Sequence, residues 1–79
     1  RSRSLKELVE YIAKSLVDDP TEVRVVVKQD RREIRVELKV AEQDMGRIIG
    51  RNGRVANAIR ALMRAAAARR GERTSLDIL

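Results

Sequence analysis

Between residues 34 and 40 the chain alternates strictly between apolar and charged side chains, and this pattern restricts its fold more than any other. The apolar positions are Ile34, Val36, Leu38 and Val40, and the charged positions between them are Arg35, Glu37 and Lys39. Because successive side chains of a β-strand point to opposite faces of a sheet, the pattern predicts a strand with one buried face and one face in water. The rest of the chain must supply the layer that covers the buried face.

The N-terminal part of the chain predicts a helix. Apolar side chains recur there at helical spacing, at Leu5, Leu8, Val9, Ile12 and Leu16. Ser4 followed by Glu7 forms a capping box, which satisfies backbone amides of the first turn. We expect a helix from about Ser4 to Val17, ended by residues 18–21, where Pro20 disfavours a helix at the residue before it.

A hairpin is predicted next. Residues 23–28 are rich in β-branched side chains, which favours a strand, and residues 29–32 form a short polar turn before the alternating segment. After residue 40 the period becomes helical again. Asp44 is placed to cap a short helix that ends at Gly50 and contains Met45, Ile48 and Ile49.

A longer helix is predicted to begin at Gly53 or Arg54 and to end at Gly71. Its expected buried face consists of Val55, Ile59, Leu62, Met63 and Ala66. Residues 74–79 predict a final strand with two apolar side chains on one side, Leu76 and Ile78.

This order of helix, strand, strand, helix, helix, strand predicts an α+β fold, formed by a single domain over residues 1–79. Two strands joined by a helical crossover normally lie parallel in one sheet with a right-handed connection, so the last strand is expected to run parallel to residues 34–40. The sheet is then mixed and three-stranded. All three helices are expected to cover one of its faces, and the other face is expected to lie in water.

Charge is distributed unevenly along the chain, whose net charge is +6. Between residues 47 and 73 there are eight arginines and one acid, Glu72, so this segment carries +7 and the remainder carries −1. A concentration of one sign of charge around two glycines favours a polyanionic partner such as nucleic acid.

Composition excludes several function classes. The chain has no cysteine and no histidine, which excludes disulfides, thiolate zinc sites and catalysis by thiol or imidazole. Acids such as Asp18, Asp19, Glu42 and Asp44 have no partner group that indicates acid–base chemistry. We therefore predict no enzyme activity, no cofactor, no metal and no small-molecule substrate. No apolar run approaches the roughly 20 residues that span a bilayer, so we expect a soluble protein without a membrane partner. The lack of cysteine fits a reducing compartment, and we expect a cytoplasmic location.

The segment Gly50-Arg51-Asn52-Gly53 is the candidate binding loop. Glycine has no Cβ, so a nucleic-acid backbone can approach the main chain closely, and glycine also adopts the positive φ angles of tight turns. Amides at the start of the following helix and the helix dipole favour an anion. Arg51 is the foremost candidate for phosphate contact, and Asn52 either donates to phosphate or sugar or only accepts a left-handed turn.

Residues on both sides of the loop are further candidates. Arg47 precedes it by one helical turn and Arg54 follows it, so both are expected to flank the same phosphates. Of Ile48, Ile49 and Val55, one or two are expected to line an apolar floor for bases, and the spacing does not choose between them. Arg60 and Arg64 are interpreted as solvated surface.

The run Ile48-Ile49-Gly50-Arg51-Asn52-Gly53 resembles the GxxG signature of KH (K-homology) domains, whose loop clamps the backbone of about four single-stranded nucleotides. The element order resembles the type II KH arrangement. Residues 5–12, 44–50 and 54–60 are similar to stand-alone bacterial KH proteins of the KhpA type, so the resemblance covers nearly the whole chain.

The resemblance implies a single-stranded RNA-binding protein, an RNA chaperone or post-transcriptional regulator that acts with a second KH-containing protein of the KhpB (Jag) type. It also implies a role in cell-envelope growth and cell shape, and a homodimer is a further expectation. Two alternatives remain open: a duplex DNA binder that uses two helices around a glycine turn, and a protein-interaction module in which the loop is incidental.

Overall fold

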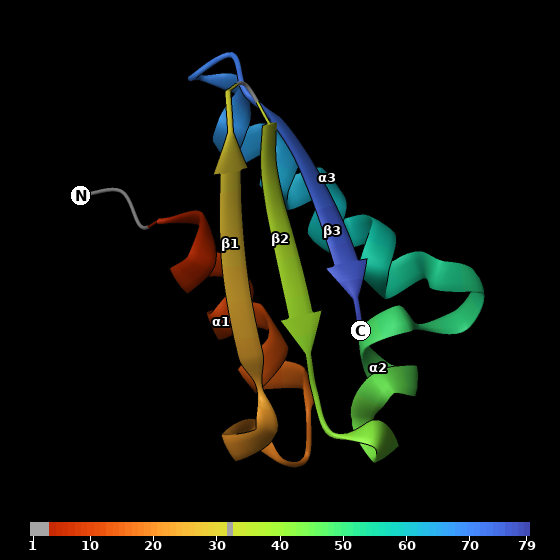
Figure 1. Cartoon of the computed structure of the whole chain (residues 1–79). Coiled ribbons are helices and arrows are strands. Elements are labelled where there is room, and N and C mark those ends of the chain that lie inside the picture. The colour runs from red at the N-terminus through yellow and green to blue at the C-terminus, as the bar shows by residue number, and fades with distance from the viewer. Residues whose placement is uncertain (1–3, 32) are drawn as a thin grey trace.

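The computed structural model describes residues 4–31 and 33–79 (Figure 1). Its elements are α1 (Leu5–Leu16), β1 (Arg24–Asp30), β2 (Glu33–Lys39), α2 (Met45–Ile49), α3 (Arg54–Ala68) and β3 (Arg73–Ile78). Single turns of 3-10 helix also occur at Pro20–Glu22, Glu42–Asp44 and Arg51–Gly53. The predicted order of helices and strands is confirmed.

The capping box at the start of α1 forms as predicted. The Ser4 hydroxyl accepts a hydrogen bond from the Glu7 amide at 3.1 Å, and the Glu7 carboxylate accepts one from the Ser4 amide at 3.1 Å. These two bonds satisfy amides that have no partner inside the helix, so α1 begins at Leu5.

The three strands form one mixed sheet in the order β1-β2-β3. β1 pairs with β2 in antiparallel fashion, with Val27 opposite Val36, and β2 pairs with β3 in parallel fashion, with Val36 opposite Leu76. This register aligns most of the apolar side chains of the three strands on one face. The predicted mixed sheet and the parallel final strand are confirmed.

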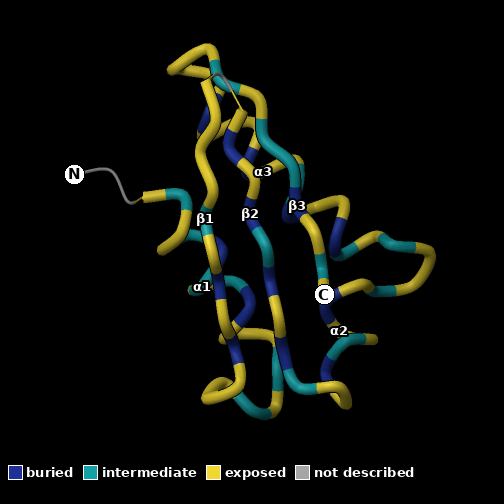
Figure 2. Tube along the Cα trace, in the orientation of Figure 1, coloured by how far each residue is buried: buried dark blue, intermediate teal, exposed yellow. Residues whose placement is uncertain are grey.

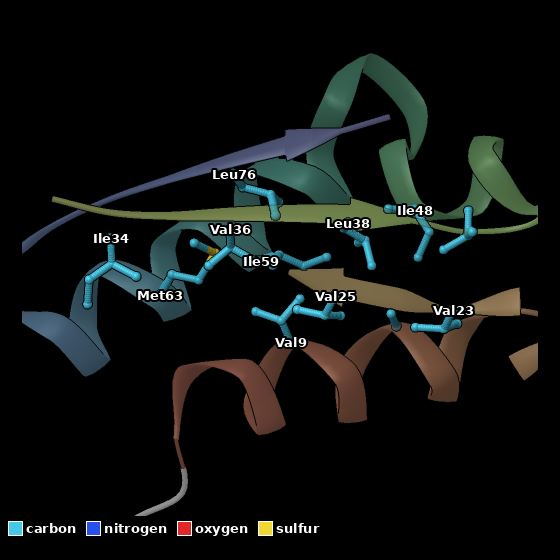
Figure 3. Close-up of a cluster of buried hydrophobic side chains, with 12 residues drawn as sticks. Val9, Val23, Val25, Ile34, Val36, Leu38, Ile48, Ile59, Met63 and Leu76 are labelled. Atoms are coloured by element: carbon cyan, nitrogen blue, oxygen red, sulfur yellow. The ribbon is translucent and has the colours of Figure 1, made fainter. Parts of the chain in front are cut away.

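The helices cover that apolar face. Figure 1 shows α1 and α3 behind the sheet, and α2 lies beside the start of α3. Each helix and each strand contributes at least one side chain to the core, as Figure 3 shows for Val9, Val25, Ile48, Val36, Met63 and Leu76. The core is small, and residues from all six elements are needed to close it.

The opposite face of the sheet lies in water, as predicted. Figure 2 shows the alternation of buried and exposed positions along β2. On the exposed face, Lys28 pairs with Glu37 at 3.3 Å. The apolar Val26 is 48% exposed there, between charged neighbours. The helices of the described residues are too short or too polar for a membrane span.

The buried face of α3 differs from the prediction. Ile59 and Met63 are buried as expected, but Leu62 is 50% exposed and Ala66 is exposed, and Ala56 and Ala67 are buried in their place. The prediction weighted large apolar residues. Small side chains allow a helix to approach a sheet closely, so the alanines face the core.

Two local predictions also need correction. The predicted hairpin turn at residues 29–32 is shorter, because Gln29 and Asp30 belong to β1 and Asp30 pairs with Glu33. Of the turn residues, Arg32 lies outside the described residues. Asp44 precedes α2 but its side chain makes no capping bond to it. Instead the Asp44 carboxylate is completely buried and accepts hydrogen bonds from the α1–β1 connection.

Candidate nucleic-acid interface

The loop between α2 and α3 is held by its own backbone. The Gly50 amide donates to the Gly46 carbonyl at 2.8 Å, which closes α2, and the Gly53 amide donates to the Gly50 carbonyl at 3.1 Å. The Arg54 amide donates to the Arg51 carbonyl. The amides of Gly53 and Arg54 are therefore hydrogen-bonded inside the loop and do not point freely toward an anion. Side-chain charge must supply more of the attraction for an anion than backbone amides do.

Three loop residues adopt positive φ angles. Gly50 has φ 76° and ψ 172°, Asn52 has φ 57° and ψ 26°, and Gly53 has φ 77° and ψ 14°. Asparagine tolerates the left-handed region better than most residues with a Cβ. Asn52 therefore has a conformational reason for its position, and its side chain is also exposed to solvent.

The two glycines differ in what surrounds them. A Cβ at Gly50 would lie 2.5 Å from Val55 Cγ2 and 2.8 Å from the Val55 amide nitrogen. A Cβ at Gly53 would meet its nearest neighbour, Asn57 Nδ2, at 3.9 Å. Gly50 is therefore required for packing against the start of α3, whereas Gly53 is required only for its φ angle, and its surface is open.

The arginines of the loop point into solvent. Arg51 and Arg54 are exposed, and among the described residues neither forms an ion pair. Arg47 differs, because its Nη1 lies 3.1 Å from Asp18 Oδ1, and both side chains are more than half exposed. The loop and its flanks thus offer two guanidinium groups that pair with no described acid, and a third that already has an acidic partner.

The two isoleucines before the loop have different environments. Ile48 is completely buried in the core, so its side chain fixes α2 and does not reach the surface. Ile49 is 39% exposed. Val55 is half-buried against the core and against Gly50. Of the two predicted isoleucines, Ile49 is therefore the one that a ligand can reach.

An open groove runs beside the loop. One wall comes from α2, the loop and α3, through Ile49, Gly53, Ala56 and Arg60. The other wall comes from the end of β3 and the residue after it, at residues 76–79. The walls are mainly aliphatic, and none of these residues is aromatic. Such a groove can hold bases by aliphatic contact and by hydrogen bonds, without ring stacking.

Arg60 is a groove residue that sequence reasoning placed on the solvated surface. Its Nη2 donates to the Leu76 carbonyl at 3.2 Å and its Nη1 donates to Asn57 Oδ1 at 3.1 Å. The guanidinium group is therefore fixed across the groove between α3 and β3. The sequence did contain a signal for this position, because Arg60 comes one helical turn after Ala56, which lies on the buried face of α3.

Comparison with known proteins shows which protein family the chain belongs to. A family model described as "KhpA/KhpB, KH domain" matches residues 6–78 of the chain. The chain belongs to this family of KH domains. Its helix-strand-strand-helix-helix-strand order is that of a type II KH fold, as the resemblance implied, and the KH domain is an RNA-recognition module and not an enzyme family.

Curated relatives of this KH domain align over nearly their whole length. The chain is 48% identical over 75 residues to the RNA-binding protein KhpA of Clostridium acetobutylicum, covering 95% of this chain and all of that protein. It is 48% identical to the protein of the same name from Borreliella burgdorferi, over 92% of this chain and 89% of that protein. The Aquifex aeolicus relative, also named RNA-binding protein KhpA, is 38% identical over 96% of each chain.

A solved structure shares the fold. The crystal structure of Aquifex aeolicus Era bound to GDP.AlF4− superposes with a TM-score of 0.68 and 22% identity, over 94% of this chain and 29% of that chain. The KH fold thus occurs there as a minor part of a larger protein. Within the described residues of this chain, no group of acids is arranged to hold a metal ion.

Proposed function

We propose that this KH domain binds single-stranded RNA, with the loop on the backbone and the bases in the neighbouring groove. The observation that carries the proposal is that Arg51 and Arg54 are exposed, form no ion pair with any described residue, and flank Gly53, which lines the groove. Guanidinium groups bind phosphate oxygens through charge-assisted hydrogen bonds. The family match and the names of the relatives support RNA as the ligand.

The predicted site residues take different roles in this proposal. Arg51, Asn52 and Arg54 contact phosphate or sugar, Gly53 gives the backbone close access, and Arg47 joins from the flank. Ile49 contributes to the floor of the groove. The remaining two act indirectly, because Ile48 anchors α2 in the core and Gly50 allows the loop to pack on α3.

The groove suggests weak and permissive base recognition. The only aromatic residue in the chain is Tyr11, in α1, and it does not line the groove. Without stacking on aromatic rings, bases are held by aliphatic contact and by Arg60, and low selectivity follows. This is the behaviour expected of an RNA chaperone or post-transcriptional regulator in the cytoplasm. A role in cell shape stays a prediction from the resemblance.

A second KH-containing protein of the KhpB type is the proposed partner, and a homodimer is the alternative assembly. The family description joins the KhpA and KhpB domains, and α3 exposes Leu62, which is 50% accessible and does not line the groove. A partner that binds there raises the RNA affinity of the assembly through effective concentration. Leu62→Glu is expected to abolish association of the chain with a KhpB-type partner, or with a second copy of itself, in analytical ultracentrifugation. It is expected to leave RNA binding of the isolated chain unchanged.

The test of RNA binding compares two variants with the same change of charge. Arg51→Glu with Arg54→Glu alters the loop, and Arg35→Glu with Lys39→Glu alters the exposed face of the sheet. Binding of a short unstructured RNA and of duplex DNA is measured by fluorescence anisotropy at two salt concentrations, with folding checked by circular dichroism.

We expect the loop variant to lose RNA binding and the sheet variant to retain most of it, because long-range charge is screened beyond about 10 Å at 0.1 M salt. The wild-type salt slope is expected to be about 0.7 for each phosphate neutralised on a single strand. Equal losses in both variants reject the loop as the site. Preference for duplex DNA would favour the DNA-binding alternative.

A further inference from the structure

Asp44 has an unusual position for an acidic side chain in this small domain. Among the described residues it is the one charged side chain that is completely buried. Its Oδ1 accepts a hydrogen bond from the Asp18 amide at 3.0 Å, and its Oδ2 accepts one from the Asp19 amide at 3.1 Å. A buried carboxylate is tolerated when such bonds compensate for lost water. Asp44 therefore ties the α1–β1 connection to the start of α2.

This tie determines where the neighbouring carboxylates lie. The Asp19 side chain accepts hydrogen bonds from the amide and the hydroxyl of Thr21, so its carboxylate is bound within its own turn. The Asp18 side chain instead lies 3.1 Å from Arg47 Nη1. Because the Asp18 amide is bound to Asp44, the backbone that carries this carboxylate is fixed within reach of Arg47. The pair is thus held in place from the backbone, although both of its side chains are exposed.

Arg47 lies on α2 one turn before Gly50, so this ion pair stands at the flank of the proposed phosphate-binding loop. We infer that Asp18 occupies Arg47 in the free protein in the place of an RNA phosphate, and that RNA displaces it. Asp44 is then a positioning residue that acts through Asp18. This inference rests on the proposed function. Within that function, Asp18 sets the affinity of the loop for a polyanion.

The exchange is energetically feasible because an exposed ion pair is weak. A phosphate oxygen can replace the carboxylate of Asp18 on Arg47 with the same charge-assisted geometry. The Asp18 charge then stays near the phosphate and repels it. Asp18 therefore lowers RNA affinity in two ways, by occupying a cation and by adding a negative charge next to the loop.

The test uses Asp18→Asn and a matched control, Asp30→Asn. Both remove one exposed carboxylate, and Asp30 lies at the β1–β2 hairpin, which Figure 1 shows at the opposite end of the sheet from the α1–β1 connection. Arg47→Gln and the double variant Asp18→Asn/Arg47→Gln complete the set. Affinity for a short unstructured RNA is measured in the intact chain at about 50 mM and 200 mM salt.

We expect Asp18→Asn to bind RNA about two- to fivefold more tightly at low salt, which is the range that an exposed ion pair supports, and to gain less at high salt because charge is screened. Asp30→Asn is expected to bind like the wild type. In the Arg47→Gln background most of the gain from Asp18→Asn is expected to vanish.

Equal affinities of Asp18→Asn and Asp30→Asn overturn the inference, and so does a gain that persists in full without Arg47. If RNA binding depends on Arg51 and Arg54 but not on Asp18, the proposed function stands and only the role of Asp18 is rejected. If the wild type binds no RNA, or the charge-reversed loop binds it equally well, both fall.

Discussion

The segment from Ile48 to Arg54, which joins α2 to α3, has two sides with opposite physical character. Its inner side, formed by Ile48 and Gly50, is packed against the core and the start of α3. Its outer side, formed by Arg51, Asn52 and Arg54, is exposed. Adjacent residues of one short motif therefore serve different purposes: the inner side holds the loop in its conformation, and the outer side is free for a ligand. Substitutions on the two sides should affect stability and binding separately.

Gly50→Ala is expected to give the largest loss of stability. The φ and ψ of Gly50 are almost restricted to glycine, which costs about 1–3 kcal/mol for another residue, and overpacking against Val55 costs about 1–3 kcal/mol more. Urea denaturation measures the change. Gly46→Ala is the control, because it lies in α2 with no atom within 4 Å of a new Cβ, and it should stabilise by about 0.5–1 kcal/mol. Similar effects of both variants would contradict the inner role of Gly50.

The two isoleucines provide the next comparison. Ile48→Ala removes a completely buried side chain and is expected to lower the free energy of unfolding by about 2–5 kcal/mol. Ile49→Ala affects a side chain that is 39% exposed, and about 1 kcal/mol is expected. RNA affinity, measured on the folded protein, should fall for Ile49→Ala. A larger loss of stability at residue 49 than at residue 48 would show that the inner and outer sides are wrongly assigned.

Asp44→Asn tests the hydrogen bonds by which Asp44 holds the α1–β1 connection near the loop. The amide side chain keeps one acceptor oxygen but presents an NH₂ group where Asp44 accepts a backbone amide. Loss of an acceptor from a buried donor costs about 1–3 kcal/mol. The free energy of unfolding should fall by that amount in urea denaturation. An unchanged midpoint would mean that the α1–β1 connection does not depend on Asp44.

Gly53→Ala should lower stability much less than Gly50→Ala. Its φ of 77° disfavours a residue with a Cβ by about 1–2 kcal/mol, but the nearest atom to a new Cβ is 3.9 Å away. We expect a loss of about 1 kcal/mol and a measurable drop in RNA affinity, because the methyl group occupies the surface that the RNA backbone approaches. If stability falls as far as in Gly50→Ala, the outer side is packed more tightly than the structure shows.

Much of the fold could be predicted because its signals are local. The alternation in residues 34–40, the capping box at Ser4 and Glu7, and the helical periods on either side each depend on neighbours in the chain. The parallel pairing of β2 and β3 followed from a general rule about crossovers. The position of the loop also followed from its glycines and the arginines around it.

The features that were missed depend on contacts between distant residues. Asp44 looked like a helix cap because its partners, 25 and 26 positions away, cannot be read from the sequence around it. Arg60 looked solvated because its partner, the Leu76 carbonyl, is a backbone atom. The buried alanines Ala56 and Ala67 carry little apolar signal, so the face of α3 was assigned to larger residues.

The most direct test of the account is a titration of the isotope-labelled chain with a short unstructured RNA, followed by backbone amide NMR. We expect the largest shifts on the outer side of the loop, at Gly53 and along residues 76–79, and almost no shift at residues 24–28 on the far strand. Largest shifts on β1, or on the exposed part of α3 around Leu62, would contradict the claim that the loop and its groove bind RNA.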